Sequence, residues 1–237
     1  MKQKLHIGRG FTLVELLVVI VIIAALAGLT APMVIRQRKK ADQTEAVNNA
    51  KQIGLAMFEF ENEYGSFPQG TLGADINART GNTLAPTSIT TSNDAFKQLM
   101  ASDIAKSEQM FYCKTSFSRT KPDNNTTGGS FLKAGEVGFS YMLFSDDTAL
   151  SSSINPSTPI VVAPLLTRGA SAIFDRDMYD SKGVVLRVDQ SVSSLNINPT
   201  GEIVLTPAAG NSTAQTLMTT GNSTVWGSRT PKMIPPQ

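Results

Sequence analysis

The stretch GFTLVELLVVIVIIAALAGL, residues 10–29, decides the fold because it combines a long apolar run with a single carboxylate. From Leu16 to Ile35 no residue is charged, and a helix of that length spans about 30 Å, the thickness of a bilayer core. Glu15 directly precedes this run, and a carboxylate inside hydrocarbon costs roughly 2.5 to 3.5 kcal/mol on insertion scales. The sequence therefore predicts a membrane-inserted helix with one acid near its start that needs an explanation.

Three kinds of N-terminal segment fit this pattern. A secretory signal peptide would end at a small-x-small cleavage site, such as Ala25-Leu26-Ala27 or Leu29-Thr30-Ala31. An uncleaved signal anchor would keep the whole segment, and a short leader cut ahead of the apolar run would leave the helix in the mature chain. A signal peptide has no use for Glu15, and an anchor gains nothing evident from it. The carboxylate therefore favours the short leader.

The residues around Glu15 resemble the N-terminus of type IV pilin-like proteins, which include the pseudopilins of type II secretion. These proteins have a short basic leader ending in Gly, a cleavage site before Phe, a Glu four residues beyond that Phe, and then a membrane-length apolar run. Gly10, Phe11 and Glu15 occupy these places. The resemblance implies that a membrane-embedded prepilin peptidase cuts between Gly10 and Phe11 on the cytoplasmic side and methylates the new amino group of Phe11.

The resemblance also suggests a partner for Glu15. In a filament core built from apolar helices, the Glu15 carboxylate of an incoming subunit can pair with the Phe11 ammonium of a neighbour. Two unit charges about 4 Å apart attract by roughly 4 kcal/mol at an effective dielectric near 20. Desolvation cancels much of that attraction, so the pair contributes mainly specificity, because a slipped subunit leaves two buried charges unpaired. We therefore expect Glu15 to direct subunit assembly.

Two further features concern the shape and the orientation of this helix. Gly28 and Pro32 lie in the second half of the run, where the missing proline donor predicts a kink or local melting, and the resemblance associates such a proline with helix unwinding in the filament. A basic cluster follows, formed by Arg36, Arg38, Lys39 and Lys40. Its four bases exceed the leader's three, so the positive-inside rule does not support the cytoplasmic N-terminus that the resemblance requires. A solvated helix face or a contact with anionic lipid headgroups explains the cluster.

The helix is expected to continue over residues 36–64 as an amphipathic segment. Apolar residues recur at spacings of three and four, and Gly65 with Pro68 ends the pattern. The predicted core-facing stripe consists of Ala46, Ala50, Ile53, Met57, Phe60 and Tyr64, broadened by Val47, Gly54, Leu55 and Phe58. The segment NAKQIGLAMFEFENEYGSFPQG, residues 49–70, is similar to the helix end and exit loop of the major pseudopilins. Together with the cleavage motif, the resemblance covers about the first third of the chain.

The remainder predicts a β-rich head. Residues 71–95 read as a polar loop, and Ser92 or Asn93 is expected to cap a short helix that buries Phe96, Leu99 and Met100. Strands are expected at residues 137–144, 159–166, 184–188, 192–197 and 202–205, the last three as a meander with a tight turn at Asn198–Gly201. Pro159 and Pro164 favour a sheet edge for their segment. From about residue 206 the chain predicts a surface arm or tail, which Trp226 could anchor.

The composition argues against most catalytic sites. Cys113 is the one cysteine, so an intramolecular disulfide and zinc-finger spacing are both excluded, and we expect it to be buried in the core. The one histidine, His6, lies in the leader, so the mature chain lacks the usual general base and we expect no enzyme. Asp175, Asp177 and Asp180 could supply oxygen ligands to calcium, but their spacing departs from an EF-hand, and an acidic turn before the strand at Val184 is the favoured interpretation. No other cofactor is expected.

These features together predict an α+β fold in which a long N-terminal helix packs on a small antiparallel β-sheet head. The expected parts are a leader at 1–10, a transmembrane and filament-core helix at 11–35, its amphipathic continuation at 36–64, and the head at 65–237. Removing the leader's three bases leaves 18 bases against 19 acids, a balance that indicates no nucleic-acid surface.

The resemblance implies a structural subunit of a type II secretion pseudopilus. Such a subunit sits in the bacterial inner membrane with its head in the periplasm, in contact with membrane lipid. It polymerises with other copies of itself into a helical filament, together with minor pseudopilins and an inner-membrane assembly platform. A type IV pilin for adhesion, motility or DNA uptake is the nearest alternative. A Sec-exported or membrane-anchored ligand-binding protein is an alternative of another class.

Overall fold

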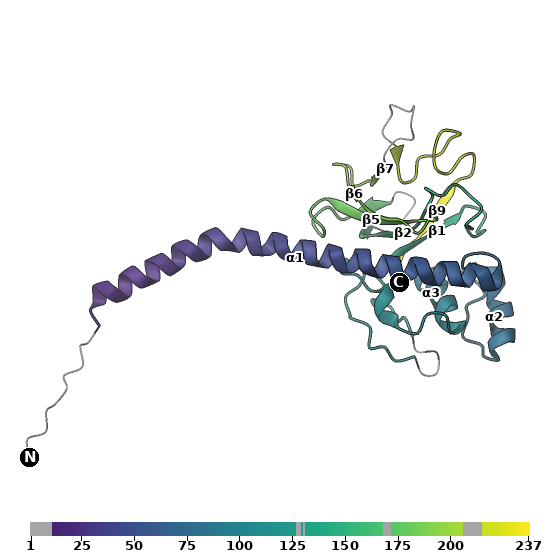
Figure 1. The fold of residues 1–237 in the computed structure, drawn as a ribbon, viewed down its shortest axis with the longest axis horizontal. Helices are drawn as coiled ribbons and strands as arrows, with labels where there is room; N and C mark the ends of the chain where they lie inside the picture. Colours follow the sequence, from purple (N-terminus) through teal and green to yellow (C-terminus); the bar gives the residue numbers. More distant parts are fainter. Residues whose placement is uncertain (1–10, 127–128, 130, 168–171, 206–214) are drawn as a thin grey trace, which may run out of the picture. The chain divides into compact units, whose positions relative to one another are not determined.

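The structure, a computed structural model, describes residues 11–126, 129, 131–167, 172–205 and 215–237. Its contacts divide the chain into two compact units, residues 1–39 and residues 40–237. The long helix α1, Leu13–Tyr64, begins in the first unit and ends in the second (Figure 1). Its bounds agree with the predicted helix from Phe11 to Tyr64, whereas the predicted leader lies outside the described residues.

Within the second unit, α1 packs one face against the head. The predicted stripe is buried, with Tyr64 half-buried at its end: Ala46, Ala50, Ile53, Met57, Phe60 and Tyr64. Gly54 allows a close approach to the sheet, since a Cβ at this position would lie 3.0 Å from Leu186 Cδ1. Leu55 and Phe58 were expected to broaden the stripe, and that expectation is wrong, because 63% and 42% of their surfaces are exposed. The helix ends where Gly65 adopts a φ of +84°, a conformation that glycine takes without strain.

The segment after α1 is more helical than its sequence predicts. A 3-10 turn η1, Gly70–Leu72, leads directly into α2, Gly73–Thr80, in place of the expected loop. Tertiary packing explains the difference, because α2 buries Ile76 completely and Gly73 lies against the chain at Pro86. A Cβ on Gly73 would lie only 2.1 Å from the Pro86 carbonyl oxygen, so this contact requires glycine.

The predicted short helix is confirmed as α3, Ser92–Ala101. Its N-cap is Thr91, one residue earlier than expected, and Thr91 forms a reciprocal capping box with Asp94. The three predicted inward-facing side chains are buried: Phe96, Leu99 and Met100. A second 3-10 turn, η2 at Glu108–Phe111, follows. In Figure 1 the strands lie along one side of residues 40–64 of α1, and α2 and α3 lie along the other.

The main sheet is antiparallel and has five strands in the order β6-β5-β2-β1-β9. Its strands are β1 Ser140–Phe144, β2 Pro159–Ala163, β5 Lys182–Arg187, β6 Val192–Asn196 and β9 Pro231–Ile234. Two small two-stranded sheets accompany it, formed by β3 Leu165–Thr167 with β4 Ile173–Phe174, and by β7 Val204–Leu205 with β8 Gln215–Thr216. The predicted α+β arrangement, a long helix followed by an antiparallel sheet, is confirmed.

Two strand predictions are wrong in instructive ways. β2 is the central strand, not an edge, because Pro159 occupies its first position and Pro164 follows its last, so neither ring interrupts the ladder. The predicted three-strand meander is a β5-β6 hairpin followed by a single antiparallel bridge between Ile197 and Ile203, because β7 pairs with β8 in a separate sheet. The tight turn at Asn198–Gly201 is confirmed, with Gly201 at a φ of +86° and its N–H donating to the Asn198 carbonyl at 3.0 Å.

The C-terminal segment corrects the prediction of a surface tail. Residues 206–214 lie outside the described residues, but residues 215–237 form part of the head. Strand β9 pairs with β1 over four residues and forms one edge of the main sheet. Trp226, expected as an anchor, is buried, and its indole Nε1–H donates to the Leu217 carbonyl at 2.7 Å. The polar composition of this segment predicts a tail because composition carries no information on long-range contacts such as the pairing of β9 with β1.

Candidate assembly site on the N-terminal helix

Thr12 and Glu15 form a closed polar unit at the start of α1. The Glu15 carboxylate accepts hydrogen bonds from the Thr12 backbone N–H at 2.9 Å and from the Thr12 hydroxyl at 2.8 Å. The Glu15 N–H in turn donates to Thr12 Oγ1 at 3.2 Å. This is the reciprocal geometry of a capping box, which satisfies backbone donors that a helix N-terminus otherwise leaves unpaired. Sequence reasoning missed Thr12, although the spacing Thr-x-x-Glu ahead of an apolar run signals such a box.

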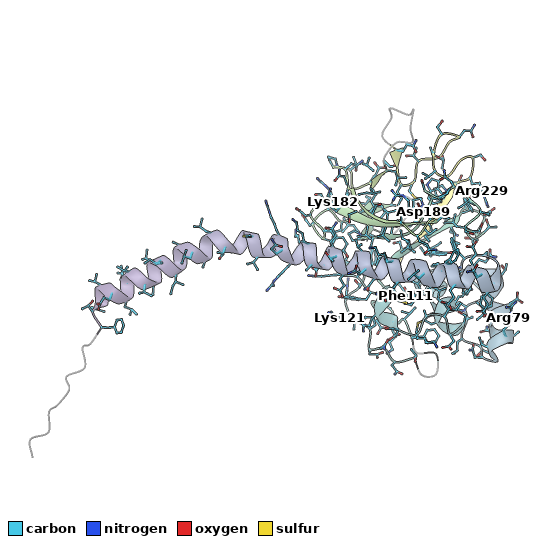
Figure 2. The ribbon with its side chains drawn as sticks, in the orientation of Figure 1. Arg79, Phe111, Lys121, Lys182, Asp189 and Arg229 are labelled. Atoms are coloured by element: carbon cyan, nitrogen blue, oxygen red, sulfur yellow. The ribbon has the colours of Figure 1, made fainter. Side chains whose placement is uncertain are left out.

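The first part of α1 exposes its apolar side chains. Among the described residues of the run, every large aliphatic side chain from Leu13 to Ile35 is exposed, and Figure 2 shows side chains projecting from all sides of this part of the helix. By length and composition, α1 contains one stretch that could cross a membrane. Glu15 and Phe11 are exposed as well, so the carboxylate is accessible from outside the chain. Gly10, the predicted residue before the cleavage site, lies outside the described residues.

The predicted kink positions lie inside an uninterrupted helix. α1 continues through Gly28 and Pro32, so local melting is absent from the single chain. Unwinding at these positions in a filament stays a prediction. Beyond them, the basic cluster is on the surface, with Arg36, Arg38 and Lys40 exposed and Lys39 half-buried.

The three calcium candidates are not gathered into a site. Asp175 accepts a hydrogen bond from the Asp177 N–H at 2.9 Å and another from the Ser116 hydroxyl at 3.3 Å, which is the geometry of an acidic turn. Asp180 is exposed at a φ of +54°. Within the described ranges, no group of three His, Cys, Asp or Glu side chains is placed to hold a metal ion. Calcium binding by these aspartates stays a prediction.

Cys113 has the environment of a core residue. Its side chain is fully buried, and that burial raises the pKa of the thiol well above its usual value. The Ser118 hydroxyl donates to its backbone carbonyl, and the Tyr179 hydroxyl donates to the adjacent Lys114 carbonyl at 2.8 Å. A thiol held in its protonated form behind other side chains is a poor nucleophile, as the sequence analysis expected.

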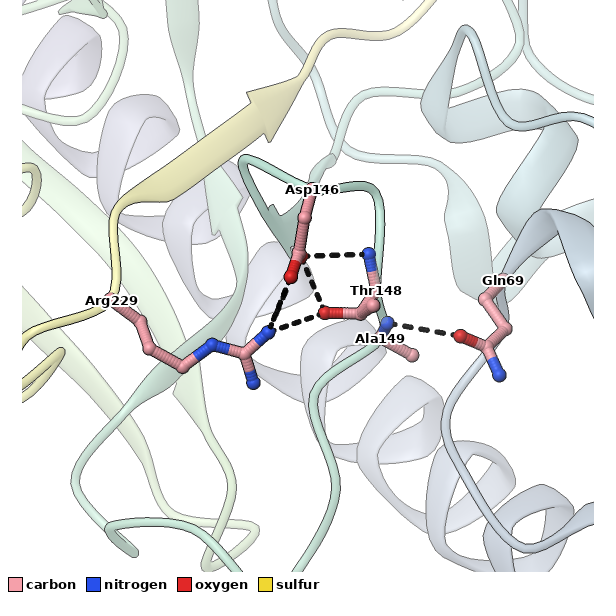
Figure 3. A network of polar contacts seen from close by, with 5 residues as sticks. All are labelled: Gln69, Asp146, Thr148, Ala149 and Arg229. Atoms are coloured by element: carbon pink, nitrogen blue, oxygen red, sulfur yellow. Dashed lines mark hydrogen bonds and ion pairs between the residues drawn. The ribbon is translucent and has the colours of Figure 1, made fainter.

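A polar network joins the exit of α1 to the far end of the chain (Figure 3). Arg229, just before β9, contacts Asp146 Oδ2 at 3.0 Å and donates to Thr148 Oγ1 at 2.6 Å. The Thr148 hydroxyl donates to Asp146 Oδ1 at 2.6 Å, and this bond is the main reason why the pKa of Asp146 lies below its usual value. The Ala149 N–H donates to Gln69 Oε1 at 3.2 Å. The network therefore fixes the exit loop of α1 to the turn after β1.

Comparisons with known proteins find similarity in the first part of the chain, which contains the capped start of α1. Residues 8–31 match the family described as the prokaryotic N-terminal methylation motif. The start of the chain therefore carries a prepilin-type N-terminal motif. Residues 37–100 match a second family, described as a protein of unknown function (DUF1559). No solved structure matches the chain at a significant level.

The similar curated proteins are each named type II secretion system core protein G. The protein from Escherichia coli K12 is 43% identical over 58 residues, which cover 24% of this chain and 40% of the relative. The protein from Dickeya chrysanthemi is 41% identical over 75 residues, covering 30% and 48%, and that from Aeromonas hydrophila is 42% identical over 74 residues, covering 30% and 51%. The chain thus spans about half the length of these relatives, or less.

Proposed function

We propose that this pilin-like chain is a structural, non-enzymatic subunit of a type II secretion pseudopilus that supports protein export. The observation that carries the proposal is the Thr12–Glu15 unit, which places one exposed carboxylate at the start of an exposed, membrane-length apolar helix. The similarity to core protein G and the match to the methylation motif support the same role. The β-rich head would form the filament surface.

The proposed life cycle begins with processing in the bacterial inner membrane. A prepilin peptidase cuts between Gly10 and Phe11 and methylates the amino group of Phe11. The helix over residues 11–35 then stores the subunit in the membrane, with the head over residues 65–237 in the periplasm. The subunit leaves the bilayer when its apolar helix transfers into the filament core, which is equally apolar, so the transfer costs little hydrophobic free energy. Minor pseudopilins and an inner-membrane assembly platform would be its partners.

Glu15 has two successive sets of contacts in this scheme. In the single chain, both hydrogen bonds from Thr12 reach the same oxygen, Oε2, so Oε1 remains available to a cation. In the filament, the Phe11 ammonium of a neighbouring subunit reaches the carboxylate and supplies roughly 4 kcal/mol of attraction at about 4 Å, much of it offset by desolvation. The pair therefore selects the register of the incoming subunit more than it adds stability.

Mass spectrometry of the mature N-terminus tests the processing step. We expect the chain purified from cells that contain a prepilin peptidase to begin at Phe11, with one methyl group on its amino nitrogen. A chain that begins near Gly28 or Pro32 would have lost its apolar helix to a signal peptidase. That result would contradict the proposal, because no helix would remain for the filament core.

Two substitutions of Glu15 separate charge pairing from helix capping. Glu15→Gln keeps an oxygen that can accept from Thr12 and so preserves the capping box, whereas Glu15→Ala removes both the cap and the charge. If the charge directs assembly, both variants insert and are cleaved normally but give few filaments. If capping alone matters, Glu15→Gln assembles like the unmodified chain, and the charge-pairing role is excluded. Inserted, processed subunit measured by immunoblot provides the matched control for each filament yield.

A further inference from the structure

Two buried carboxylates hold a single turn of the head. Glu108, in η2, is completely buried, and Glu136 is only 3% exposed. The Glu108 carboxylate accepts the Leu132 N–H at 2.6 Å through Oε1, and the Glu136 carboxylate accepts the Lys133 N–H at 2.6 Å through Oε2. These two amides are neighbours in the chain, so both acids act on the same turn, residues 132–136, which we call the clasp.

The clasp joins α3 to the segment that follows β9. The buried Asn93 side chain of α3 donates through Nδ2 to the Leu132 carbonyl at 3.0 Å and to the Lys133 carbonyl at 3.1 Å. Asn93 Oδ1 in turn accepts the Gln237 N–H at 2.9 Å, and the Gly135 N–H donates to the Gln237 carbonyl at 3.1 Å. The contact from α3 is therefore uncharged, and the clasp holds the chain just beyond the edge strand of the main sheet.

The clasp has a strained backbone and one unpaired buried oxygen. Leu132 is completely buried at a φ of +52°, a conformation that is costly for a leucine and persists only where surrounding contacts impose it. Glu108 Oε2 is buried as well, and it has no hydrogen-bond partner in the described part of the chain. Burial without partners penalises the ionised form of a carboxyl group far more than the protonated form. The closed clasp therefore fits a protonated Glu108.

The charged groups around Glu108 act in the same direction as its burial. Desolvation is the main reason why the pKa of Glu108 lies above its usual value, and the negative charges of Glu136 and Asp123 raise it further. The hydrogen bond from the Leu132 N–H lowers this pKa, but by less than burial raises it. Lys133 is the cation of the clasp, and its ammonium is held by Asp123 at 2.7 Å. Ionisation of Glu108 thus adds a further negative charge beside Glu136 in a buried turn.

We propose that Glu108 is a proton-sensitive lock, which keeps the clasp closed while it is protonated and opens residues 132–136, releasing Gln237, when it ionises. Opening admits water to the carboxylate, which the closed turn leaves without a partner for Oε2. The closed head binds this proton more tightly than the open one, so closure is favoured at acidic pH and the open population grows as the pH rises above 4.5. This device goes beyond the structural role of the head and operates in a single chain.

Amide hydrogen exchange of the full-length chain in detergent micelles tests the lock. The reporters are the N–H groups of Gly135 and Gln237, which bond to other partners than Glu108, and their rates are corrected for the intrinsic effect of pH. We expect the open population to rise at least about threefold between about pH 4 and about pH 7. Glu108→Gln cannot ionise and keeps an acceptor for the Leu132 N–H, so it should abolish this rise. The matched control, Glu59→Gln, removes an exposed carboxylate of α1 and should leave the rise unchanged.

A second variant decides the matter if Glu108→Gln fails to fold. Glu136→Gln removes the neighbouring charge but still accepts the Lys133 N–H, so Glu108 should lose its proton at a lower pH and the rise should shrink. The lock is overturned if the corrected exchange of Gly135 and Gln237 does not change with pH, or if neither variant alters it. It is also overturned if these amides are as protected as those of β2, because the clasp would then open only with the whole head.

Discussion

Replacing Trp226 measures how much the C-terminal segment contributes to the head. The indole is 4% exposed, packs edge-on against Phe144 with ring centroids 6.3 Å apart, and donates its N–H to the Leu217 carbonyl. Trp226→Phe keeps an aromatic ring but removes that donor, which leaves a buried carbonyl unpaired. Trp226→Ala also removes the ring and leaves a cavity.

The two variants should differ in size of effect. A buried acceptor without its partner costs about 1–3 kcal/mol, so we expect the free energy of unfolding to fall by that amount in Trp226→Phe. A Trp-to-Ala truncation in a core costs about 3–5 kcal/mol. Since about 1.4 kcal/mol corresponds to a tenfold change in an equilibrium constant, the open population should rise roughly 5- to 150-fold in the first variant and roughly 150- to 4,000-fold in the second.

Cys113 provides the assay, because it is the one cysteine and is fully buried in the head. Its rate of alkylation in the full-length chain in detergent micelles, measured over a series of urea concentrations, reports the population of opened head. Leu166→Ala is the matched control, since Leu166 is 44% exposed in the same unit and should change the free energy by at most about 0.5 kcal/mol. If Trp226→Ala labels no faster than Leu166→Ala, the C-terminal segment is dispensable for the head, and the reasoning is refuted.

Three further changes test other parts of the structure. Thr12→Ala removes the capping partner of Glu15 and should weaken the first helical turn by about 1 kcal/mol, seen as faster amide exchange at residues 13–16 in micelles; unchanged exchange would contradict the capping box. Gly138→Ala would place a Cβ 2.2 Å from the Cys113 carbonyl oxygen, so the urea midpoint should fall by the equivalent of about 1–3 kcal/mol, and an unchanged midpoint would show that the backbone yields freely. Burial raises the pKa of Glu108 in the folded head above its usual 4.5. As the pH rises above 4.5, the unfolded chain therefore loses this proton at a lower pH than the folded head, and the free energy of unfolding decreases. Glu108→Gln should flatten this slope in urea titrations between acid and neutral pH, and an identical slope would exclude the effect.

The sequence predicted elements whose stability is encoded locally. α1 follows from an apolar run and a stripe with helical spacing, and α3 follows from a cap and three apolar residues at the same spacing. The turn at Asn198–Gly201 follows from the glycine that its geometry requires. Each of these signals lies within a few turns of the chain, so no knowledge of distant contacts was needed to find it.

The incorrect predictions concern features that depend on contacts between residues far apart in the sequence. α2 forms in a polar, loop-like sequence because Ile76 and Gly73 pack against the rest of the head. The central place of β2 depends on β9, which arrives from the C-terminus and completes the sheet beyond β1. Leu55 and Phe58 satisfy the helical spacing of a core stripe, yet both are exposed. Periodicity marks an apolar face and does not reveal which partner covers it.

That last error bears on assembly. In a protein that stays monomeric in water, the helix surface that the head leaves exposed is usually polar. Apolar side chains there contribute no burial free energy, because they remain hydrated. α1 departs from this rule at Leu55 and Phe58 and along the whole run from Leu16 to Ile35. The membrane explains the run before assembly, but it does not explain Leu55 and Phe58, which lie 20 and 23 positions beyond Ile35 within the head unit. In the proposed filament, the helices of neighbouring copies would cover the apolar run, because each copy presents an equally apolar surface.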